Sequence, residues 1–361
     1  MSWPSWLPLR ETLRPMSPYG APQVPAVAAL NTNENPYSPS LALQKAITDA
    51  VANVSAELNR YPDRDATILR SKLATYINEG SGTNFTLENV WAANGSNEII
   101  QSIFLAFAQG PVLGFTPSYS MHPLIAKTTG AQWIDGKRNA DFSLNTADAV
   151  VEILKNRPTL TFITTPNNPT GGAVTLDSIQ ALADAAKVVG GLLVVDEAYA
   201  EFSQEISAVT LIPDNPHVIV IRTMSKAFAF AGVRVGYLIS DVAVKDAMMI
   251  VRLPYHLSSL TQAAAQVALD HRAELLGGVA TLIQARGTVV QALHDMGLTT
   301  ITSSANFVLF TGFNQDAPQL WAALLEKGVL IRDVGLSGYL RVTIGNDAEN
   351  QLFISALKEL I

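Results

Sequence analysis

Short apolar runs alternate with longer amphipathic segments along the first two thirds of the chain. The runs are rich in Val, Ile and Leu and end at polar, Gly or Pro residues, which is typical of strands buried on both faces of a sheet. Apolar positions with helical spacing lie between most of them and predict helices over residues 41–54, 97–107 and 176–189. This alternation predicts an α/β fold, with a mostly parallel sheet between helices. We expect seven strands, at residues 90–93, 112–115, 131–134, 160–163, 192–195, 218–221 and 235–239.

The pattern changes toward both ends of the chain. A long helical tract covers residues 261–296, with Gly277-Gly278 as the expected break. Short strands and one helix over residues 316–327 follow, and they predict a small α+β domain. Residues 1–40 are rich in Pro and Asn and are expected to form an extended arm. A chain of 361 residues is also long enough for two domains.

Composition excludes several classes of function. A hydrophobic content of 48% supports a buried sheet and argues against disorder. The formal net charge of −7 provides no basic surface for nucleic acid, so local arginines and helix ends must hold any anionic ligand. The absence of cysteine excludes disulfides, thiolate catalysis and zinc–thiolate sites, and we expect no metal. The amino end does not resemble a signal peptide, and no apolar run approaches the roughly 20 residues of a membrane helix. We therefore expect a soluble cytoplasmic protein.

A lysine lies among small hydroxylated residues after the run at 218–221. The segment includes Thr223, Ser225 and Lys226, and Arg234 follows shortly afterwards. A lysine amine can condense with an aldehyde, while hydroxyls and a guanidinium can hold a phosphate. Pyridoxal phosphate carries both groups, so the segment is consistent with a site for this cofactor. For a Ser-Lys pair alone, a surface lysine would be the better interpretation.

Two further polar motifs follow apolar runs. Asp196 ends the run at 192–195, so it lies at the carboxyl end of a central strand, where open α/β sheets bind ligands. A partly buried carboxylate needs a cationic partner, and a protonated pyridine nitrogen would supply one. Capping a helix or binding a metal are the alternatives for Asp196. The rigid turn at 167–171 directs the Asn168 amide toward the edge of the same sheet.

In this order, the motifs resemble the class I and II aminotransferases of pyridoxal-phosphate fold type I. The resemblance extends over nearly the whole chain and includes motifs at 30–36, 60–63 and 340–345. These flanking motifs are most similar to the histidinol-phosphate branch of the family. Two departures blur the assignment to this branch but leave the reaction class intact. The segment 95–98 reads Gly-Ser-Asn-Glu where the branch more often has Gly-Ala-Asp-Glu, and Thr165 stands where Asn is common.

The resemblance implies a domain organisation and roles for the central residues. A large cofactor-binding domain would cover residues 41–255, and a small domain would combine residues 256–361 with the arm. Lys226 would hold the cofactor covalently and then move the substrate proton, while Asp196 would pair with the pyridinium nitrogen. Asn168 and Tyr199 would hydrogen-bond the cofactor's phenolic oxygen, although Tyr199 could instead be ordinary core packing. Tyr119 would stack on the pyridine ring, with simple loop packing as its alternative.

The resemblance also implies a phosphate site. Gly95, Ser96 and Asn97 open a predicted helix, whose free amides and positive dipole end attract an anion. Helix capping is the structural alternative for Ser96 and Asn97, and both roles are compatible. Thr223, Ser225 and Arg234 would complete the site. Tyr61 is similar to a tyrosine that reaches the phosphate of the neighbouring subunit, which would make a homodimer obligatory.

Substrate recognition is assigned by resemblance to Arg332 and Arg341, with Tyr19 closing over the imidazole side and Asn168 nearby. A guanidinium fits both a phosphate and a carboxylate. A surface salt bridge is the alternative for Arg332, and a loose terminal tyrosine is the alternative for Tyr19.

The expected activity is transamination between L-histidinol phosphate and 2-oxoglutarate, a step of histidine biosynthesis. An aromatic-amino-acid aminotransferase would share every catalytic residue and is the closest alternative. A decarboxylase of phosphorylated amino acids is a further one. A cofactor-sensing regulator is disfavoured because no basic DNA-binding segment precedes the motifs. A nucleotide-binding fold is disfavoured because no Gly-x-Gly-x-x-Gly turn follows an early strand.

Overall fold

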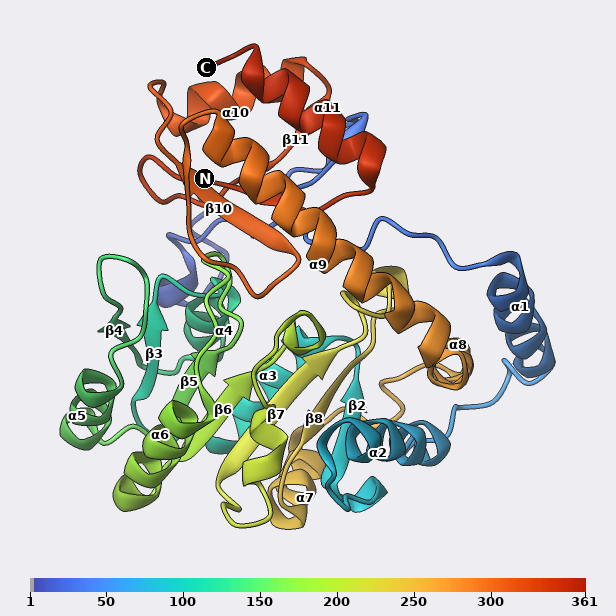
Figure 1. The fold of residues 1–361 in the computed structure, drawn as a ribbon. Helices are drawn as coiled ribbons and strands as arrows, with labels where there is room; N and C mark the ends of the chain where they lie inside the picture. Colours follow the sequence, from blue (N-terminus) through green and yellow to red (C-terminus); the bar gives the residue numbers. More distant parts are fainter. Residues whose placement is uncertain (1–2) are drawn as a thin grey trace.

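A seven-stranded sheet forms the centre of the larger part of the molecule in the computed structural model, which describes residues 3–361 (Figure 1). The strand order is β2-β8-β7-β6-β5-β3-β4. Neighbouring strands from β7 to β4 are parallel, and only β8 is antiparallel to its neighbours. The predicted fold class, a mostly parallel seven-stranded sheet, is therefore confirmed. The strands are β2 (Val90–Ala93), β3 (Val112–Thr116), β4 (Trp133–Lys137), β5 (Leu160–Thr164), β6 (Leu192–Asp196), β7 (Val218–Thr223) and β8 (Gly236–Ile239).

One predicted strand lies later in the chain than expected. Residues 131–134 were expected to form it, but β4 begins at Trp133 and continues to Lys137. Helix α4 ends at Gly130, and the N–H of Ala131 still bonds to the carbonyl of Ala126. The end of this helix therefore uses the first of the residues that the apolar pattern assigned to the strand.

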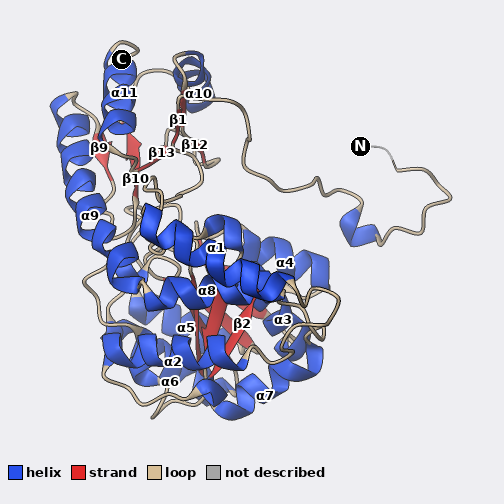
Figure 2. Ribbon diagram, turned by 90° about the vertical axis from the view of Figure 1, so that its right-hand side faces the viewer, coloured by secondary structure: helices blue, strands red, loops and turns tan. Residues whose placement is uncertain are grey.

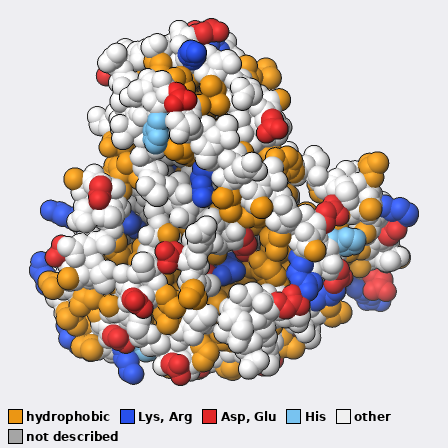
Figure 3. All heavy atoms as spheres, viewed as in Figure 1, with side chains coloured by type: hydrophobic (Ala, Val, Ile, Leu, Met, Phe, Trp, Pro, Cys, Tyr) orange, Lys and Arg blue, Asp and Glu red, His pale blue; other side chains and the backbone are white. Residues whose placement is uncertain are grey.

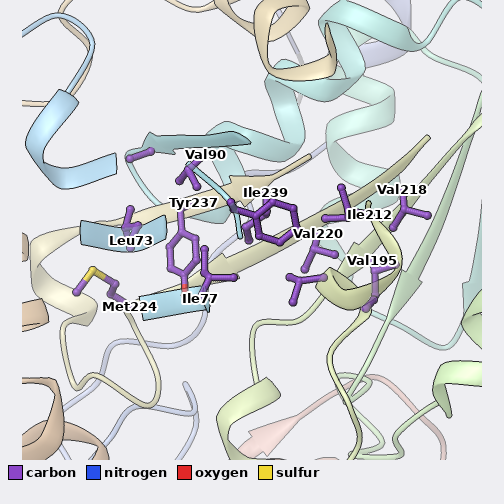
Figure 4. Close-up of a cluster of buried hydrophobic side chains, with 14 of the residues drawn as sticks. Leu73, Ile77, Val90, Val195, Ile212, Val218, Val220, Met224, Tyr237 and Ile239 are labelled. Carbon is purple, nitrogen blue, oxygen red and sulfur yellow. The ribbon is translucent and has the colours of Figure 1, made fainter. Parts of the chain in front are cut away.

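Helices cover both faces of this sheet, as the strand pattern requires. Side chains alternate along β6, so Leu193 and Val195 belong to one core while Val194 belongs to the other. Helices α2, α5, α6 and α8 pack on the first face, part of whose core is shown in Figure 4, and α3, α4 and α7 pack on the second. The helices are α1 (Leu41–Ser55), α2 (Thr67–Ser81), α3 (Ser96–Phe107), α4 (Met121–Thr129), α5 (Thr146–Asn156), α6 (Leu176–Val189), α7 (Val242–Val251) and α8 (Ser259–Asp270).

A smaller unit with its own core lies above the carboxyl ends of the parallel strands (Figure 1). It contains a four-stranded antiparallel sheet in the order β12-β13-β10-β9 and a two-stranded parallel pair, β1-β11. Its helices are α9 (Arg272–Asp295), α10 (Ala317–Glu326) and α11 (Asp347–Lys358). The strands are β1 (Ala28–Ala29), β9 (Thr299–Thr300), β10 (Phe307–Thr311), β11 (Val329–Leu330), β12 (Arg332–Asp333) and β13 (Leu340–Thr343).

The predicted helix break at Gly277-Gly278 is wrong. Helix α8 ends at Asp270, α9 begins at Arg272, and both glycines lie inside α9. A Cβ at Gly278 would make only an ordinary contact with the ring of Tyr37 at 3.4 Å, and one at Gly277 would meet nothing within 4 Å. The chain instead turns at His271, between the two helices.

The amino-terminal arm connects the two parts of the molecule (Figure 2). The guanidinium of Arg10 donates to the carbonyl of Thr128 on α4. Further along, Ala28 and Leu30 belong to the core of the small unit. Residues 1 and 2 of the predicted arm lie outside the described residues. Domain boundaries near residues 40 and 255 remain a proposal.

Five short 3₁₀ segments complete the fold. They are η1 (Glu11–Leu13), η2 (Leu87–Asn89), η3 (Ala200–Phe202), η4 (Ala208–Leu211) and η5 (Ala231–Val233). Acidic and basic side chains are interspersed on the face shown in Figure 3. Within residues 3–361, each helix is too short or too polar to cross a lipid bilayer.

Candidate active site

A cavity of about 560 Å³ lies where β5, β6 and β7 end beneath the small unit. Parallel strands deliver their carboxyl ends to one edge, so residues far apart in sequence meet there. The arm and the small unit close the cavity from the other side. The residues predicted from the sequence that line it are Tyr19, Ser96, Asn97, Tyr119, Asn168, Asp196, Tyr199, Thr223, Ser225, Lys226, Arg234, Arg332 and Arg341.

Lys226 lies in the middle of this lining, in the loop after β7. Its Nζ donates to the carbonyl of Thr32 in the arm at 2.8 Å. The pKa of the Lys226 amine is lowered to about 8, first by burial and then by the positive charge of Arg341, while Glu34 opposes the shift. A lowered pKa provides more neutral amine near pH 7, which is the form that attacks a carbonyl carbon.

Asp196 ends β6 and is only 2% exposed. Its Oδ1 accepts from the N–H of Ala198 at 3.2 Å, and its Oδ2 lies 3.2 Å from Nε2 of His122. An ionised carboxylate only accepts hydrogen bonds, so Nε2 of His122 donates. These two contacts fix the position of the Asp196 carboxyl group at the cavity wall.

The sequence analysis did not identify His122. This histidine lies on α4 and is 2% exposed, in contact with the rings of Tyr119 and Phe162. A single histidine in an amphipathic segment carries no local signal of function. Its proximity to Asp196 depends on how α4 packs against the sheet.

Tyr199 presents its hydroxyl to the cavity from the loop after β6. The oxygen accepts from Nδ2 of Asn33 at 2.8 Å and from Nδ2 of Asn168 at 3.5 Å. Burial raises the pKa of the Tyr199 phenol, so the hydroxyl keeps its proton. Because both amides occupy the oxygen as an acceptor, that proton remains available for donation to a ligand. The contact from Asn33 was missed, although its motif at 30–36 had been noted.

The opposite end of the cavity forms an anion cradle. Gly95 is the N-cap of α3 and has φ +84°, and Ser96 and Asn97 open the helix with their amides at the cavity. A Cβ at Gly95 would lie 2.7 Å from Nη2 of Arg234, so the glycine is needed for the arginine to approach. Amides at a helix start, together with a guanidinium, attract an anion such as phosphate.

Two hydroxyl groups and a tyrosine border this cradle. Oγ1 of Thr223 donates to Oγ of Ser225 at 2.9 Å and accepts from the N–H of Ser225 at 3.1 Å. The hydroxyl of Tyr119 donates to Oδ1 of Asn97 at 3.1 Å, which fixes its ring on the cavity wall. The polar groups therefore point toward one place from β7 and from α3.

Two arginines line the roof of the cavity. Arg332 on β12 is paired in register with Arg341 on β13. Arg341 is 6% exposed and donates to Oδ1 of Asn168 at 2.5 Å and to the carbonyl of Asn31 at 2.7 Å. Burial lowers the pKa of Arg341 to about 10, which leaves it charged at neutral pH. Among residues 3–361, the buried Nε of Arg341 has no hydrogen-bond partner.

Tyr61 lies elsewhere and does not line the cavity. Its side chain is 80% exposed, and its ring stacks on Tyr255 at 4.4 Å between centroids. A role for Tyr61 in the site of a second subunit stays a prediction.

Together these groups fit pyridoxal phosphate. The lining combines a carboxylate, a lysine amine and an anion cradle. The hydroxyl oxygen of Tyr199 accepts from two amides, so its proton can be donated to a ligand within the cavity.

Comparisons with known proteins agree with this chemistry. Residues 25–357 match the family described as "Aminotransferase class I and II". A histidinol-phosphate aminotransferase of Mycolicibacterium vanbaalenii is 54% identical over 355 residues, which is 97% of this chain and 95% of that protein. The protein of the same description from Mycolicibacterium smegmatis is 52% identical over 358 residues, or 98% of this chain and 93% of that protein.

Solved structures share the fold at lower identity. A histidinol-phosphate aminotransferase from Sinorhizobium meliloti, in complex with pyridoxal-5'-phosphate, is 24% identical with a TM-score of 0.81 and covers 93% of this chain and 91% of that one. The histidinol-phosphate aminotransferase from Clostridium acetobutylicum is 23% identical with a TM-score of 0.82, covering 92% of this chain and 99% of that one.

Proposed function

This chain belongs to the class I and II aminotransferases, and we propose that it transfers the amino group of L-histidinol phosphate to 2-oxoglutarate. The products are imidazole-acetol phosphate and L-glutamate, in a step of histidine biosynthesis. The observation that carries this proposal is the identity of more than 50%, over almost the full length of both chains, to histidinol-phosphate aminotransferases. The paired arginines at the cavity roof support it, because the donor carries a phosphate monoester where most amino donors carry a carboxylate.

The proposed cofactor is pyridoxal 5'-phosphate. When bound, it supplies an electron sink for the electrons left on the substrate carbon that loses its proton. The Lys226 amine would hold the aldehyde of the cofactor. The same amine would accept the proton of the substrate carbon and return it at the neighbouring position.

The side chains around Lys226 control charge. Asp196, held by His122, favours a protonated pyridine nitrogen because an adjacent anion stabilises the cationic form. Tyr199 would donate its proton to the phenolic oxygen, and Asn168, whose Nδ2 donates to the Tyr199 hydroxyl, would assist. Tyr119 would cover the ring from the cavity wall.

The phosphate of the cofactor is assigned to the anion cradle of Gly95, Ser96, Asn97, Thr223, Ser225 and Arg234. Tyr61 is proposed to reach the same phosphate in the neighbouring subunit of a cytoplasmic homodimer. Its exposed position, stacked on Tyr255, supports a role outside its own chain's cavity.

The two substrates must bind to the same pair of arginines, one in each half-reaction. Arg332 and Arg341 would hold the phosphate of histidinol phosphate in one half-reaction and a carboxylate of 2-oxoglutarate or glutamate in the other. A guanidinium suits both, because its planar fork fits two oxygens of either anion. Tyr19, which lines the cavity from the arm and is 51% exposed, would cover the imidazole ring.

A second candidate is transamination of aromatic amino acids. The rings of Tyr19 and Tyr119 in the cavity lining would also suit a phenyl side chain. This reaction would use the same catalytic residues. Decarboxylation of a phosphorylated amino acid has less support, since the relatives of high identity carry the aminotransferase description.

One titration distinguishes these candidates. The purified, cofactor-loaded protein should show a visible absorption band that L-histidinol phosphate bleaches, and 2-oxoglutarate should restore it. The ratio of kcat/KM for histidinol phosphate to that for phenylalanine should exceed about 100, since leaving the arginine donors without the phosphate costs roughly 3 kcal/mol. A ratio of about one or less would favour the aromatic candidate, and release of carbon dioxide without consumption of oxoglutarate would indicate the decarboxylase.

A further inference from the structure

A buried cluster of charges lies behind the cavity, at the carboxyl ends of β6 and β7. The side chains of Arg222, Glu197 and Glu201 are 11%, 3% and 9% exposed. Nε and Nη2 of Arg222 donate to Oε2 of Glu197 at 3.1 and 2.9 Å, and Nη1 lies 3.5 Å from Oε1 of Glu201. None of these three side chains lines the cavity, so the proposed reaction does not use them directly.

The cluster is joined to the cavity by the alternation of the strands. Glu197 follows Asp196 directly, and Arg222 directly precedes Thr223. Successive side chains of a strand point to opposite faces, so Asp196 and Thr223 reach the cavity while their neighbours reach the cluster. The N–H of Glu197 also bonds to the carbonyl of Ile221 at 2.9 Å, which ties the two strand ends together.

Glu197 and Glu201 flank Tyr199 at equal distances along the chain. One guanidinium therefore holds the loop on both sides of the residue that presents its hydroxyl to the cavity. Glu197 is fixed further by Oγ of Ser207 at 2.6 Å and by the N–H of Ala208 at 2.7 Å. On the far side, the hydroxyl of Tyr76 donates to Oε1 of Glu201 at 3.1 Å.

Stability alone is a poor explanation for this cluster. Removing two carboxylates and a guanidinium from water is costly, and apolar residues of similar volume often serve a fold equally well. A planar fork that binds two carboxylates does, however, fix a loop in a single position. Without the cation, two buried acids would remain close together and would repel each other.

We propose that Arg222 is a positioning residue, which clamps the loop 197–201 so that Tyr199 directs its hydroxyl proton at the bound cofactor. This inference rests on the role of Tyr199 in the proposed function. Arg222 acts through Tyr199 and touches neither cofactor nor substrate. Its loss should therefore reproduce the loss of the Tyr199 hydroxyl and should add nothing once that hydroxyl is gone.

The test is a double-mutant cycle read by absorption. Holoenzyme variants Tyr199→Phe, Arg222→Lys and the double variant are titrated with alkali, and the pH midpoint of the change in the visible cofactor band is measured. A hydroxyl that donates to the phenolic oxygen favours the deprotonated form, so Tyr199→Phe should raise the midpoint by about one to two pH units. Arg222→Lys keeps the charge but loses the fork, and it should raise the midpoint in the same direction.

The outcomes distinguish a positioning role of Arg222 from a purely structural role. The inference is supported if the double variant has the midpoint of Tyr199→Phe alone. It is overturned if Arg222→Lys lowers the melting temperature without moving the midpoint, or if the two shifts add, and the proposed function then stands. A Tyr199→Phe variant with an unchanged midpoint would instead contradict the role assigned to Tyr199, and the inference with it.

Two further variants complete the design. Arg70→Lys is the matched control, since Arg70 is 3% exposed, binds the carbonyls of Val90, Leu87 and Asp65, and lies outside the cavity lining. It should lower the melting temperature and leave the midpoint unchanged. Should Arg222→Lys fail to fold, Glu197→Gln replaces it in the cycle. The amide of glutamine has the same volume, but its NH₂ group would face groups that donate to Glu197. The midpoint should therefore shift in the same direction as in Arg222→Lys.

Discussion

Nε2 of His122 lies 3.2 Å from Oδ2 of Asp196, and both side chains are 2% exposed. A histidine on α4 thus holds the carboxylate at the end of β6 from the side. This pair forms because the buried face of α4 packs on the sheet, where the ring of His122 contacts Phe162 of β5. The contribution of this pair to activity can be measured by replacing each residue in turn.

Asp196→Asn should retain the fold and lower kcat by at least about 100-fold, the loss typical of removing one preorganised charge-stabilising group. His122→Phe keeps a ring against Phe162 but removes the donor, and it should cost about 10-fold, the equivalent of one hydrogen bond to a charged group. Steady-state kinetics with histidinol phosphate provide both values. On the Asp196→Asn background, His122→Phe should add little, and a full additional 10-fold loss would contradict a role through Asp196.

Gly95→Ala should weaken cofactor binding. The new Cβ would lie 2.7 Å from Nη2 of Arg234, so the guanidinium must shift away from the start of α3, and alanine would also be strained at φ +84°. The loss of a charged hydrogen bond corresponds to about a 10- to 100-fold higher Kd for pyridoxal phosphate, measured by spectral titration of the cofactor-free protein. Gly82→Ala is the matched control, because Gly82 also has positive φ (+68°) but nothing within 4 Å of its Cβ position. It should cost about 1–2 kcal/mol of stability and leave the Kd unchanged.

The rate of cofactor loading should depend on the protonation state of the Lys226 amine. The pKa of Lys226 in the cofactor-free protein is about 8, lowered from 10.5, and only the neutral amine attacks the aldehyde. The rate of loading should therefore rise from pH 6 through a midpoint near pH 8 and level off above about pH 9. Stopped-flow absorption at constant ionic strength provides the profile. In Arg341→Gln the midpoint should move upward, because a positive charge that disfavours protonation is gone; a midpoint near 10.5 in the unmodified protein would contradict the shift.

A mixing experiment tests the shared active site. Lys226→Ala removes the amine from its own site, whereas Tyr61→Ala would damage the site of the neighbouring subunit. If the chains are mixed under conditions that exchange subunits, half of the dimers should be hybrids with one intact site, and about a quarter of the activity of the unmodified enzyme should return. No recovery, with hybrids verified by mass spectrometry, would place Tyr61 within its own chain's site, and full activity of Tyr61→Ala alone would remove Tyr61 from catalysis.

The sheet and the residues at its edge were predictable because their signals are local. Apolar runs such as 192–195 and 218–221 mark buried strands, and a polar residue directly after such a run must lie at the carboxyl edge. Asp196 and Lys226 could be placed at the same edge without knowledge of the strand order. The residues of the anion cradle were predictable for the same reason, since a glycine and two polar residues open a helix.

The residues that were missed depend on contacts between distant segments. His122 reaches Asp196 across 74 positions, and Asn33 reaches Tyr199 across 166 positions. Gly277 and Gly278 resembled a helix break by composition, but the helix continues through both and the break lies at His271. A periodic pattern reports which face of an element is buried but not which side chain lies opposite it.

The pairing of β1 with β11 has a consequence for the timing of assembly. Ala28 and Ala29 align with Val329 and Leu330, and the N–H of Asn33 bonds to Oγ1 of Thr343. At about 5–20 residues per second, a ribosome needs roughly 15–60 s to advance from one partner strand to the other. During that interval β1 has no strand to pair with, and the part of the cavity wall that the arm contributes is incomplete. A nascent chain therefore cannot enclose its coenzyme before translation is almost finished.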